Sequence, residues 1–425
     1  MVSTGVTRVL LCGLFACACE PSEETTVDAT SPDAASAPDM PAGPMLPEGC
    51  GAFLEPGEDD QTALQTLLIE ALENSTVCLS AGTFRLNLET SLTVDGVTVR
   101  GAGRELTTLD FSTQDAGANG MLIRGNGVTV EHLTVKNTPG DGLRADDVDG
   151  ISFLDVAVIW EADESLENGA YGLYPVNSAN VLIDGCLVRG ARDAGIYVGQ
   201  SHNIIVRNSE ASGNVAGIEI ENSTDAEVYE NYAHDNAGGL LVFNLPELPV
   251  QDGARANVHH NRVENNNGIN FGAAGTTVAA VPPGTGILII ASDDNEVHHN
   301  TITGHDSGAL IVLSYITDLL GEYDDARFNA YPTGNWVHDN TFADNGAMAM
   351  GVLEVLPIPM PLPDLIWDGC LENEADAMDP LRRNCFSGNI DADFANIRFC
   401  DNLEDQVTDI STVECTHVPL MPIVL

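Results

Sequence analysis

The scarcest feature of this sequence is positive charge. Its 425 residues include 64 aspartates and glutamates but only 16 lysines and arginines, and Lys136 is the single lysine. Proteins that bind nucleic acids need clustered cationic side chains to contact phosphates. The formal net charge of −48 therefore argues against a nucleic-acid partner. It permits divalent cations or cationic partners, although a solvated acidic surface is the simplest interpretation.

Long apolar segments are also missing. The apolar run at residues 9–19 follows Arg8 and is too short to span a bilayer, a pattern typical of an export signal covering residues 1–19. Its end, LFACAC, resembles a bacterial lipobox, and Cys17 and Cys19 are alternative lipidation sites. A lipid there would anchor the protein to a bacterial membrane, facing the periplasm or the cell surface. Residues 20–48, rich in proline, alanine, serine and acids, predict a disordered tether.

Neither a CxxCH haem motif nor a CxxC zinc pattern occurs. The cysteines outside the signal instead predict disulfides, as expected for an exported protein. Cys50 and Cys78 are expected to pair near the N-terminal end, and Cys186 to remain a buried thiol. Four further cysteines should form two disulfides in one of three pairings: Cys370, Cys385, Cys400 and Cys415.

A repeat of 22 residues is the main positive feature. GIYVGQS begins at residue 195 and recurs as GIEIENS at residue 217. Eight glycines precede comparable apolar runs: Gly120, Gly142, Gly172, Gly195, Gly217, Gly239, Gly286 and Gly308. A second alternating run follows each of them, and strands that cannot bury an apolar face alone must stack on their neighbours. The sequence predicts an all-β, right-handed parallel β-helix of about 10–11 coils over residues 49–366.

Both ends of this solenoid need covers, because open sheet edges invite aggregation. Residues 62–72 place leucines on one face and predict a short N-terminal capping helix. Residues 367–425, with their four cysteines, should cap the other end. Between the ends, four asparagines are expected to form a ladder at one turn of successive coils: Asn231, Asn261, Asn300 and Asn340.

The chain resembles a family of exported bacterial β-helix proteins, often lipoproteins, whose repeats are similar to those of mannuronan C5-epimerases and polysaccharide lyases. The resemblance rests on NGAYGLYPV (168–176), DAGIYVGQSHNIIVRN (193–208), NVAGIEIENS (214–223), GGLLVFNLPELP (238–249), VPPGTGILI (281–289) and VHDNTF (337–342). It implies a fold and a location outside the cytoplasm, but fold does not transfer activity. The Lys or Arg base of β-helix lyases has no counterpart here, and ASDDN with TGHDSG does not reproduce the spacing of polygalacturonase motifs.

Within the repeated frame, Ile196 and Val198 should face inward and Tyr197 outward. The same register predicts an outward column: Leu122, Arg144, Tyr174, Tyr197, Glu219, Leu241, Leu288 and Leu310. A neighbouring outward column is Arg124, Asp146, Val176, Gly199, Glu221, Phe243, Ile290 and Val312. Aromatic rings with carboxylates and an arginine on an elongated face suit a sugar chain.

Candidate catalytic residues on this face are Glu219, Glu221, Tyr197 and Arg144, because neighbouring carboxyl groups can take the roles of acid and base. Candidate substrate-binding residues are Tyr174, Asp193, Trp160, Glu161, Asp146 and Phe243. Insertions at 244–256, 315–334 and 354–366 should cover the apolar upper part of the column, with Tyr315, Asp324, Asp325 and Tyr331 as secondary candidates. The connection 267–285 leaves from a different turn.

No metal site is predicted. His259, His298 and His338 are expected to stack in successive coils, and Asp293 with Asp294 is the one candidate for calcium. Two hypotheses follow for function. The first is a membrane-tethered protein that binds a polysaccharide and acts on it as a lyase, epimerase or hydrolase. The second is a non-catalytic scaffold that presents its loops to another exported protein.

Overall fold

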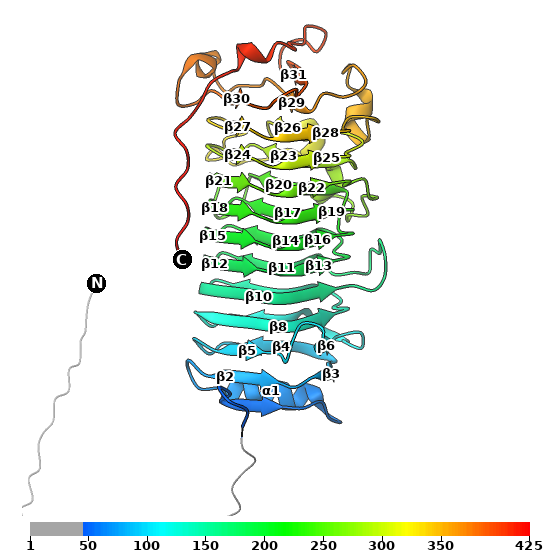
Figure 1. Cartoon of the computed structure of the whole chain (residues 1–425), viewed down its shortest axis with the longest axis vertical. Helices are drawn as coiled ribbons and strands as arrows, with labels where there is room; N and C mark the ends of the chain where they lie inside the picture. Colours follow the sequence, from blue (N-terminus) through cyan, green and yellow to red (C-terminus); the bar gives the residue numbers. More distant parts are fainter. Residues whose placement is uncertain (1–45) are drawn as a thin grey trace, which may run out of the picture. The chain divides into compact units, whose positions relative to one another are not determined.

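The computed structural model describes residues 46–425, so the predicted signal, both lipidation cysteines and most of the predicted tether lie outside the described residues. The described chain winds into stacked coils whose strands pair in parallel (Figure 1). Two sheets result, one of 20 strands and one of 11 strands. The predicted all-β parallel solenoid is confirmed. No helix within residues 46–425 has the length and apolar character needed to cross a membrane.

The 11-stranded sheet contributes one strand to each coil along one face. Its strands are β4 (Leu88–Leu92), β7 (Ala116–Ile123), β9 (Asp141–Asp146), β11 (Tyr171–Val176), β14 (Ala194–Gly199), β17 (Ala216–Glu221), β20 (Gly238–Phe243), β23 (Thr285–Ile290), β26 (Leu310–Leu313), β29 (Leu365–Trp367) and β31 (Phe394–Asn396). We call it the site sheet, because the candidate residues lie on its outward face.

The 20-stranded sheet forms the remaining faces of the coils. Its strands are β1 (Ala52–Leu54), β2 (Thr76–Leu79), β3 (Gly82–Arg85), β5 (Thr98–Arg100), β6 (Thr107–Asp110), β8 (Val128–Lys136), β10 (Asp149–Ile159), β12 (Ala179–Asp184), β13 (Leu187–Arg189), β15 (His202–Arg207), β16 (Glu210–Ser212), β18 (Thr224–Tyr229), β19 (Tyr232–His234), β21 (Ala254–His259), β22 (Arg262–Glu264), β24 (Glu296–His298), β25 (Thr301–Thr303), β27 (Trp336–His338), β28 (Thr341–Ala343) and β30 (Cys385–Ser387). Inward Val, Ile and Leu side chains of both sheets form one continuous core.

The ends of the stack are closed as the sequence predicts. Helix α1 (Asp60–Glu70) buries Leu64 and Leu68 against the first coils, and the Asp59 side chain caps it by accepting a hydrogen bond from the amide of Thr62. Cys50 pairs with Cys78, which ties the segment before α1 to β2. At the other end, β29 pairs with β31, so the stack continues past residue 366.

The C-terminal region is held by two more disulfides. Among the three pairings that the sequence allowed, the structure has Cys370–Cys400 and Cys385–Cys415, and Cys186 is a buried free thiol. The final segment then runs back along the 20-stranded sheet (Figure 1). The Leu420 amide donates to Glu296, and the Ile423 amide donates to Glu227.

An asparagine ladder fixes the turns of successive coils. Each buried side-chain amide donates to the side chain of the next coil at 2.9–3.1 Å and receives an amide from the coil before it. The ladder contains the four predicted residues and continues to Asn389: Asn231, Asn261, Asn300, Asn340 and Asn389. Because almost every polar atom at this corner is satisfied, the ladder locks one coil in register with the next.

Replacing Asn300 by alanine is expected to lower the free energy of unfolding by about 2–4 kcal/mol, because buried partners in both neighbouring coils lose their hydrogen bonds. Chemical denaturation of the full chain measures this. Asn373→Ala, at an exposed position with no side-chain hydrogen bond among those found, is the matched control and should change stability by less than about 0.5 kcal/mol. Equal losses in both variants would contradict a structural role for the ladder.

Candidate functional site

The outward row at the centre of the site sheet is built by parallel pairing. Arg144 pairs with Tyr174 between β9 and β11, and Tyr197 pairs with Glu219 between β14 and β17. Paired residues on adjacent strands lie about 4.8 Å apart along the stack. Side chains separated by 22 or more residues in sequence therefore stand next to one another on one face.

Three tyrosines cluster on this row. The ring centroids of Tyr171 and Tyr174 lie 4.5 Å apart, and those of Tyr197 lie 4.6 Å from Tyr171 and 5.0 Å from Tyr174. The Arg144 guanidinium lies over the Tyr174 ring, 4.9 Å from its centroid. Tyr197 is buried beneath its neighbours, while Tyr171 and Tyr174 are partly exposed. The accessible aromatic surface thus consists of Tyr171 and Tyr174 rather than of Tyr197.

Glu219 and Glu221 form a buried pair of carboxyl groups. Burial, followed by the nearby charge of Glu221, raises the pKa of Glu219 well above its ordinary value. Burial also raises the pKa of Glu221, but hydrogen bonds from Tyr197, Glu219 and Gln200 oppose this rise. The Tyr197 hydroxyl donates to Glu221 Oε1 at 2.7 Å, and Gln200 Nε2 donates to the same oxygen at 3.2 Å. Of the two, Glu219 is therefore the group whose protonated form burial favours more strongly, and Glu221 is the one that accepts hydrogen bonds.

Two aspartates extend the acidic cluster along the near edge of the sheet. Burial and the charge of Glu221 raise the pKa of Asp193 to about 7, against an opposing hydrogen bond from Tyr171. Burial likewise raises the pKa of Asp141 to about 6, although Arg144 lowers it. The face thus holds four carboxyl groups with raised pKa values, and such groups concentrate at functional sites. We call Asp141, Asp193, Glu219 and Glu221 the acid cluster.

A glycine gives Tyr197 access to Glu221. Gly199 is paired with Glu221 on the next strand, and the Tyr197 ring lies over it. A Cβ at position 199 would collide with the phenol, because the space that it would occupy contains the Tyr197 hydroxyl. The gap in the outward column at Gly199 is therefore filled by the tyrosine from its own strand.

An open pocket adjoins the tyrosines on the N-terminal side. It is lined by Arg124, Asp146, Asp147 and Asn177. Asp146 accepts from Arg144 at 3.3 Å and lies 3.7 Å from Arg124, so both arginines converge on one carboxylate. In a chain with 16 cationic side chains, two arginines beside an aromatic surface are a notable concentration of positive charge. This pocket and the adjoining tyrosines form the accessible part of the face.

Three predicted substrate-binding residues lie elsewhere. Trp160 is in the core, where its Nε1 donates to the Thr138 carbonyl at 2.7 Å. Glu161 is exposed and pairs with Lys136 at 2.9 Å, away from the acid cluster. Phe243 faces outward but is fully buried under the insertions. Packing buries Trp160 and Phe243, so the prediction that these two contact a substrate is wrong, whereas the same prediction for Glu161 is untested.

The upper part of the outward face is covered. Leu241 and Leu288 pack with side chains from the insertions, including Phe328 and Ile358. The connection 267–285, which leaves from another turn, contributes Val278 and Val281 to the same cluster. The secondary candidates make contacts within these loops. The Tyr315 hydroxyl donates to the Leu320 carbonyl, and Asp325 forms an ion pair with Arg327. The Asp324 amide donates to Glu247, and Tyr331 packs at the edge of this cluster.

The register also changes above this point. Leu288 pairs with Ile311, not with Leu310, so Ile311 and Leu313 face outward while Leu310 and Val312 enter the core. The 22-residue spacing from Gly286 to Gly308 predicts the opposite orientation, and the coil contains one residue more than that spacing provides. Polar candidates cannot be extended beyond β20 on this face, because its upper outward positions are apolar and buried.

The predicted histidine column stacks. Ring centroids of His259 and His298, and of His298 and His338, are each 5.0 Å apart and nearly parallel. Burial lowers the pKa of His298 to about 4, whereas hydrogen bonds that His338 donates to Glu296 and Asp339 outweigh burial and raise the pKa of His338. Asp293, the calcium candidate, instead accepts from the amide and hydroxyl of Thr333 and stabilises a turn.

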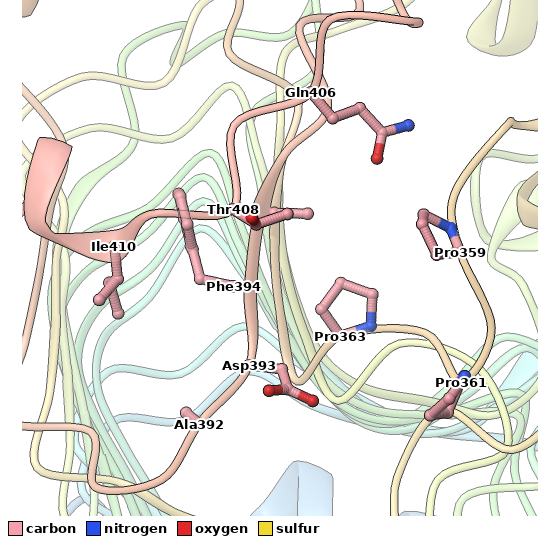
Figure 2. Close-up of a pocket in the computed structure, with 10 residues that line it drawn as sticks. Pro359, Pro361, Pro363, Ala392, Asp393, Phe394, Gln406, Thr408 and Ile410 are labelled. Atoms are coloured by element: carbon pink, nitrogen blue, oxygen red, sulfur yellow. The ribbon is translucent and has the colours of Figure 1, made fainter.

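A further hollow lies at the C-terminal end. Pro359, Pro361 and Pro363 stand on one side of it, and Thr408 and Ile410 on the other (Figure 2). Asp393 is its only titratable side chain. It offers no pair of groups for acid–base chemistry, so the acid cluster remains the better candidate site.

The sequence analysis missed Tyr171, Asp141 and Gln200. Strict alternation from Tyr174 places Gly172 outward, but a Cβ on Gly172 would meet Val188 inside the coil, so this glycine occupies an inner corner. The residue before it consequently points outward, as Tyr171 does and as Asp141 does before Gly142. The sequence contains a signal for Tyr171 and Asp141, because each of them directly precedes a repeat glycine and so takes the same outward position in its coil.

The fold and the register define a class. The chain is a right-handed parallel β-helix repeat protein, and residues 119–302 match the family model described as a right handed beta helix region. A comparison with curated proteins finds no match.

The chain is similar to several solved structures. The A-module of a mannuronan C-5 epimerase from Azotobacter vinelandii is 13% identical, with a TM-score of 0.49, covering 80% of this chain and 92% of that chain. PfbA, a surface adhesin of Streptococcus pneumoniae, is 11% identical, with a TM-score of 0.47 over 69% and 80%. An alginate lyase from Paenibacillus sp. is 15% identical, with a TM-score of 0.39 over 71% and 98%. Such identities concern the fold alone.

The acid cluster predicts a pH-dependent stability. The folded protein keeps the Asp193 proton up to a pKa of about 7, while the unfolded chain releases it near 3.8, so the free energy of unfolding falls as the pH rises between these values. Asp193→Asn should remove this contribution, so that the free energy of unfolding decreases by about 2 kcal/mol less than in the wild type over this pH range. Urea denaturation from pH 4.5 to 8 measures it.

Asp252→Asn, at an exposed aspartate away from the cluster, is the control and should leave the pH dependence unchanged. If Asp193→Asn and the wild type lose stability equally over this range, Asp193 is ionised throughout and the electrostatic description of the cluster is wrong.

Proposed function

We propose that the protein binds a polysaccharide along the outward face of β7, β9, β11, β14 and β17 and hydrolyses it with the acid cluster. One observation carries this proposal: burial raises the pKa of Glu219 well above its ordinary value beside a second carboxyl group, Glu221, on a face with partly exposed aromatic rings and arginines. Flat rings suit pyranose faces, and the arginines with Asp146 suit hydroxyl or carboxylate groups of the sugars.

Hydrolysis fits the cluster better than elimination or epimerisation. Glycoside hydrolysis requires one protonated carboxyl group that donates to the leaving oxygen. It also requires one ionised carboxylate that either attacks the sugar or activates the water molecule that does so. Elimination and C5 epimerisation require a base that removes a carbon-bound proton. Burial raises the pKa of Tyr174 to about 12 and raises the pKa of Tyr197 well above its usual range. Neither tyrosine is therefore a base at neutral pH.

The cluster assigns separate roles to its members. We assign the general acid to Glu219, which is buried beneath the face, because burial raises its pKa while the neighbouring Glu221 accepts hydrogen bonds from Tyr197 and Gln200. Asp193, whose pKa is about 7, is the candidate base. Arg144 and Tyr174 bind and orient the sugar next to these groups.

The proposal includes a location outside the cytoplasm with a lipid anchor at Cys17 or Cys19. Three disulfides within residues 46–425 support it, because such bonds persist in oxidising compartments. The acidic surface is compatible with a soluble body held next to a membrane by a tether.

Binding is tested first, with a panel of neutral and acidic glycans. Tyr174→Ala should weaken binding of the recognised glycan about tenfold, or about 1.4 kcal/mol, because the exposed stacking surface is lost. Isothermal calorimetry measures this. Glu161→Gln lies outside the face and should bind like the wild type.

Turnover is tested with the same panel. Glu219→Gln keeps the shape of the side chain but cannot donate a proton as an acid does, so hydrolysis should fall at least a hundredfold while binding is retained. Reducing-end release measures it. Binding without turnover in the wild type would restrict the function to glycan recognition. If no glycan binds and deletion of 315–334 abolishes capture of a protein partner, the scaffold alternative replaces the proposal.

A further inference from the structure

A second column of polar side chains lies on the 20-stranded sheet, at the turn after β18, β21, β24 and β27. Each member directly follows one residue of the paired row Tyr229, His259, His298 and His338. The members are Glu230, His260, His299 and Asp339. All four are exposed and share a left-handed backbone, with φ of 55°, 55°, 54° and 51°. An identical conformation on successive coils projects each side chain from the same place, one coil above the last.

The two histidines in this column are aligned with each other. The rings of His260 and His299 stack with centroids 5.2 Å apart and an interplanar angle of 6°. Their ring edges therefore point in the same direction, toward solvent. This pair differs from the inner row of His259, His298 and His338, which is largely buried against the sheet.

Hydrogen bonds from the inner row set the tautomer of the outer pair. His259 Nε2 donates to Glu227 at 3.2 Å, so its Nδ1 accepts, and the partner of that nitrogen is His260 Nδ1 at 2.8 Å. His298 Nε2 donates to Asn257 Oδ1 at 3.1 Å, and its Nδ1 lies 2.8 Å from His299 Nδ1. In both coils the outer imidazole thus carries its hydrogen on Nδ1, which leaves a free lone pair on the outward Nε2.

Such an arrangement is the second shell that metal-binding histidines need. A ligating imidazole usually donates its other ring N–H to a fixed acceptor, which sets its tautomer and orientation. Here each acceptor is the imidazole of the adjacent residue, itself held by Glu227 or Asn257. Glu230 lies one coil from His260 and offers a carboxylate on the same exposed column.

We propose that His260 and His299 form a divalent transition-metal site on the 20-stranded sheet, with Glu230 and water completing the coordination. Residues 46–425 contain no preformed cluster of three His, Cys, Asp or Glu ligands, so the site assembles when the exposed rings tilt. Metal–nitrogen bonds of about 2.0–2.1 Å place two adjacent ligating nitrogens about 3 Å apart, so each ring must tilt toward the other and move its Nε2 by about 1 Å from parallel stacking.

Two imidazoles and a carboxylate select the ion. Imidazole suits copper, nickel and zinc, and affinity among divalent ions rises to Cu²⁺. Calcium and magnesium prefer all-oxygen sites and should not compete. The site lies on a different sheet from the acid cluster and does not depend on the proposed hydrolysis.

The test titrates Cu²⁺, and separately Zn²⁺, into the full chain purified without a histidine tag. Calorimetry should show one strong site per chain, and the electron paramagnetic resonance of Cu²⁺ should show two imidazole nitrogens. His260→Asn and His299→Asn should each weaken this site at least tenfold. Asparagine adopts the left-handed backbone readily, so both variants should fold, which circular dichroism checks.

His202→Asn, at an exposed histidine without a stacked histidine partner, is the matched control and should bind metal like the wild type. Excess Mg²⁺ should not displace Cu²⁺. Three results would overturn the proposal: no strong site, a Cu²⁺ spectrum with a single imidazole nitrogen, or unchanged affinity in both His260→Asn and His299→Asn. Glycan binding and turnover are measured on the same samples, so failure here is distinguishable from failure of the proposed hydrolysis.

Discussion

Every row of side chains in this protein depends on the parallel, in-register pairing of each coil with the next. Backbone hydrogen bonds hold adjacent strands about 4.8 Å apart, and the asparagine ladder fixes the rotation of one coil relative to the other. A one-residue slip would reverse the side chains along a strand and empty the core. The same constraint places Tyr197 against Glu219 and His260 against His299, so structural register and candidate chemistry have one origin.

The acid cluster is costly for the fold. Burying carboxyl groups next to one another disfavours their ionisation, and the structure relieves this cost by keeping Glu219 protonated and by giving Glu221 hydrogen bonds from Tyr197 and Gln200. The buried Glu219 Oε2 still has no hydrogen-bond partner among residues 46–425. An apolar pair would be more stable at these positions, as Leu241 and Leu288 show one and two coils above. Perturbed carboxyls retained on an outward face are better explained by function than by stability.

The fold was predictable because its signal is repeated many times. Glycines 22 residues apart and alternating strands each point to stacked coils, and one ambiguous repeat does not change that inference. The outward column was predictable through Leu288, because up to that coil the outward residue follows each repeat glycine by two positions. It failed at Leu310, because the coil between β23 and β26 contains one extra residue. Period alone cannot reveal where an insertion absorbs a residue.

The site was predictable only in part. The register placed Arg144, Tyr174, Tyr197, Glu219 and Glu221 on one face, but it did not show that Tyr197 is buried beneath Tyr171. Trp160 was misplaced because the end of β10 turns its ring into the core. These outcomes depend on contacts between residues far apart in sequence, which a repeat pattern does not contain.

The central claim is that the outward face of the site sheet holds protonated carboxyl groups at neutral pH. Infrared spectroscopy of the full chain at pH 7 measures this directly, since a carboxylic acid and a carboxylate absorb at separate frequencies. The account predicts a carboxylic acid band that is clearly weaker in Glu219→Gln, where Asp193 with its pKa of about 7 still contributes, and unchanged in Glu161→Gln. A wild-type spectrum with ionised carboxylates alone would contradict it.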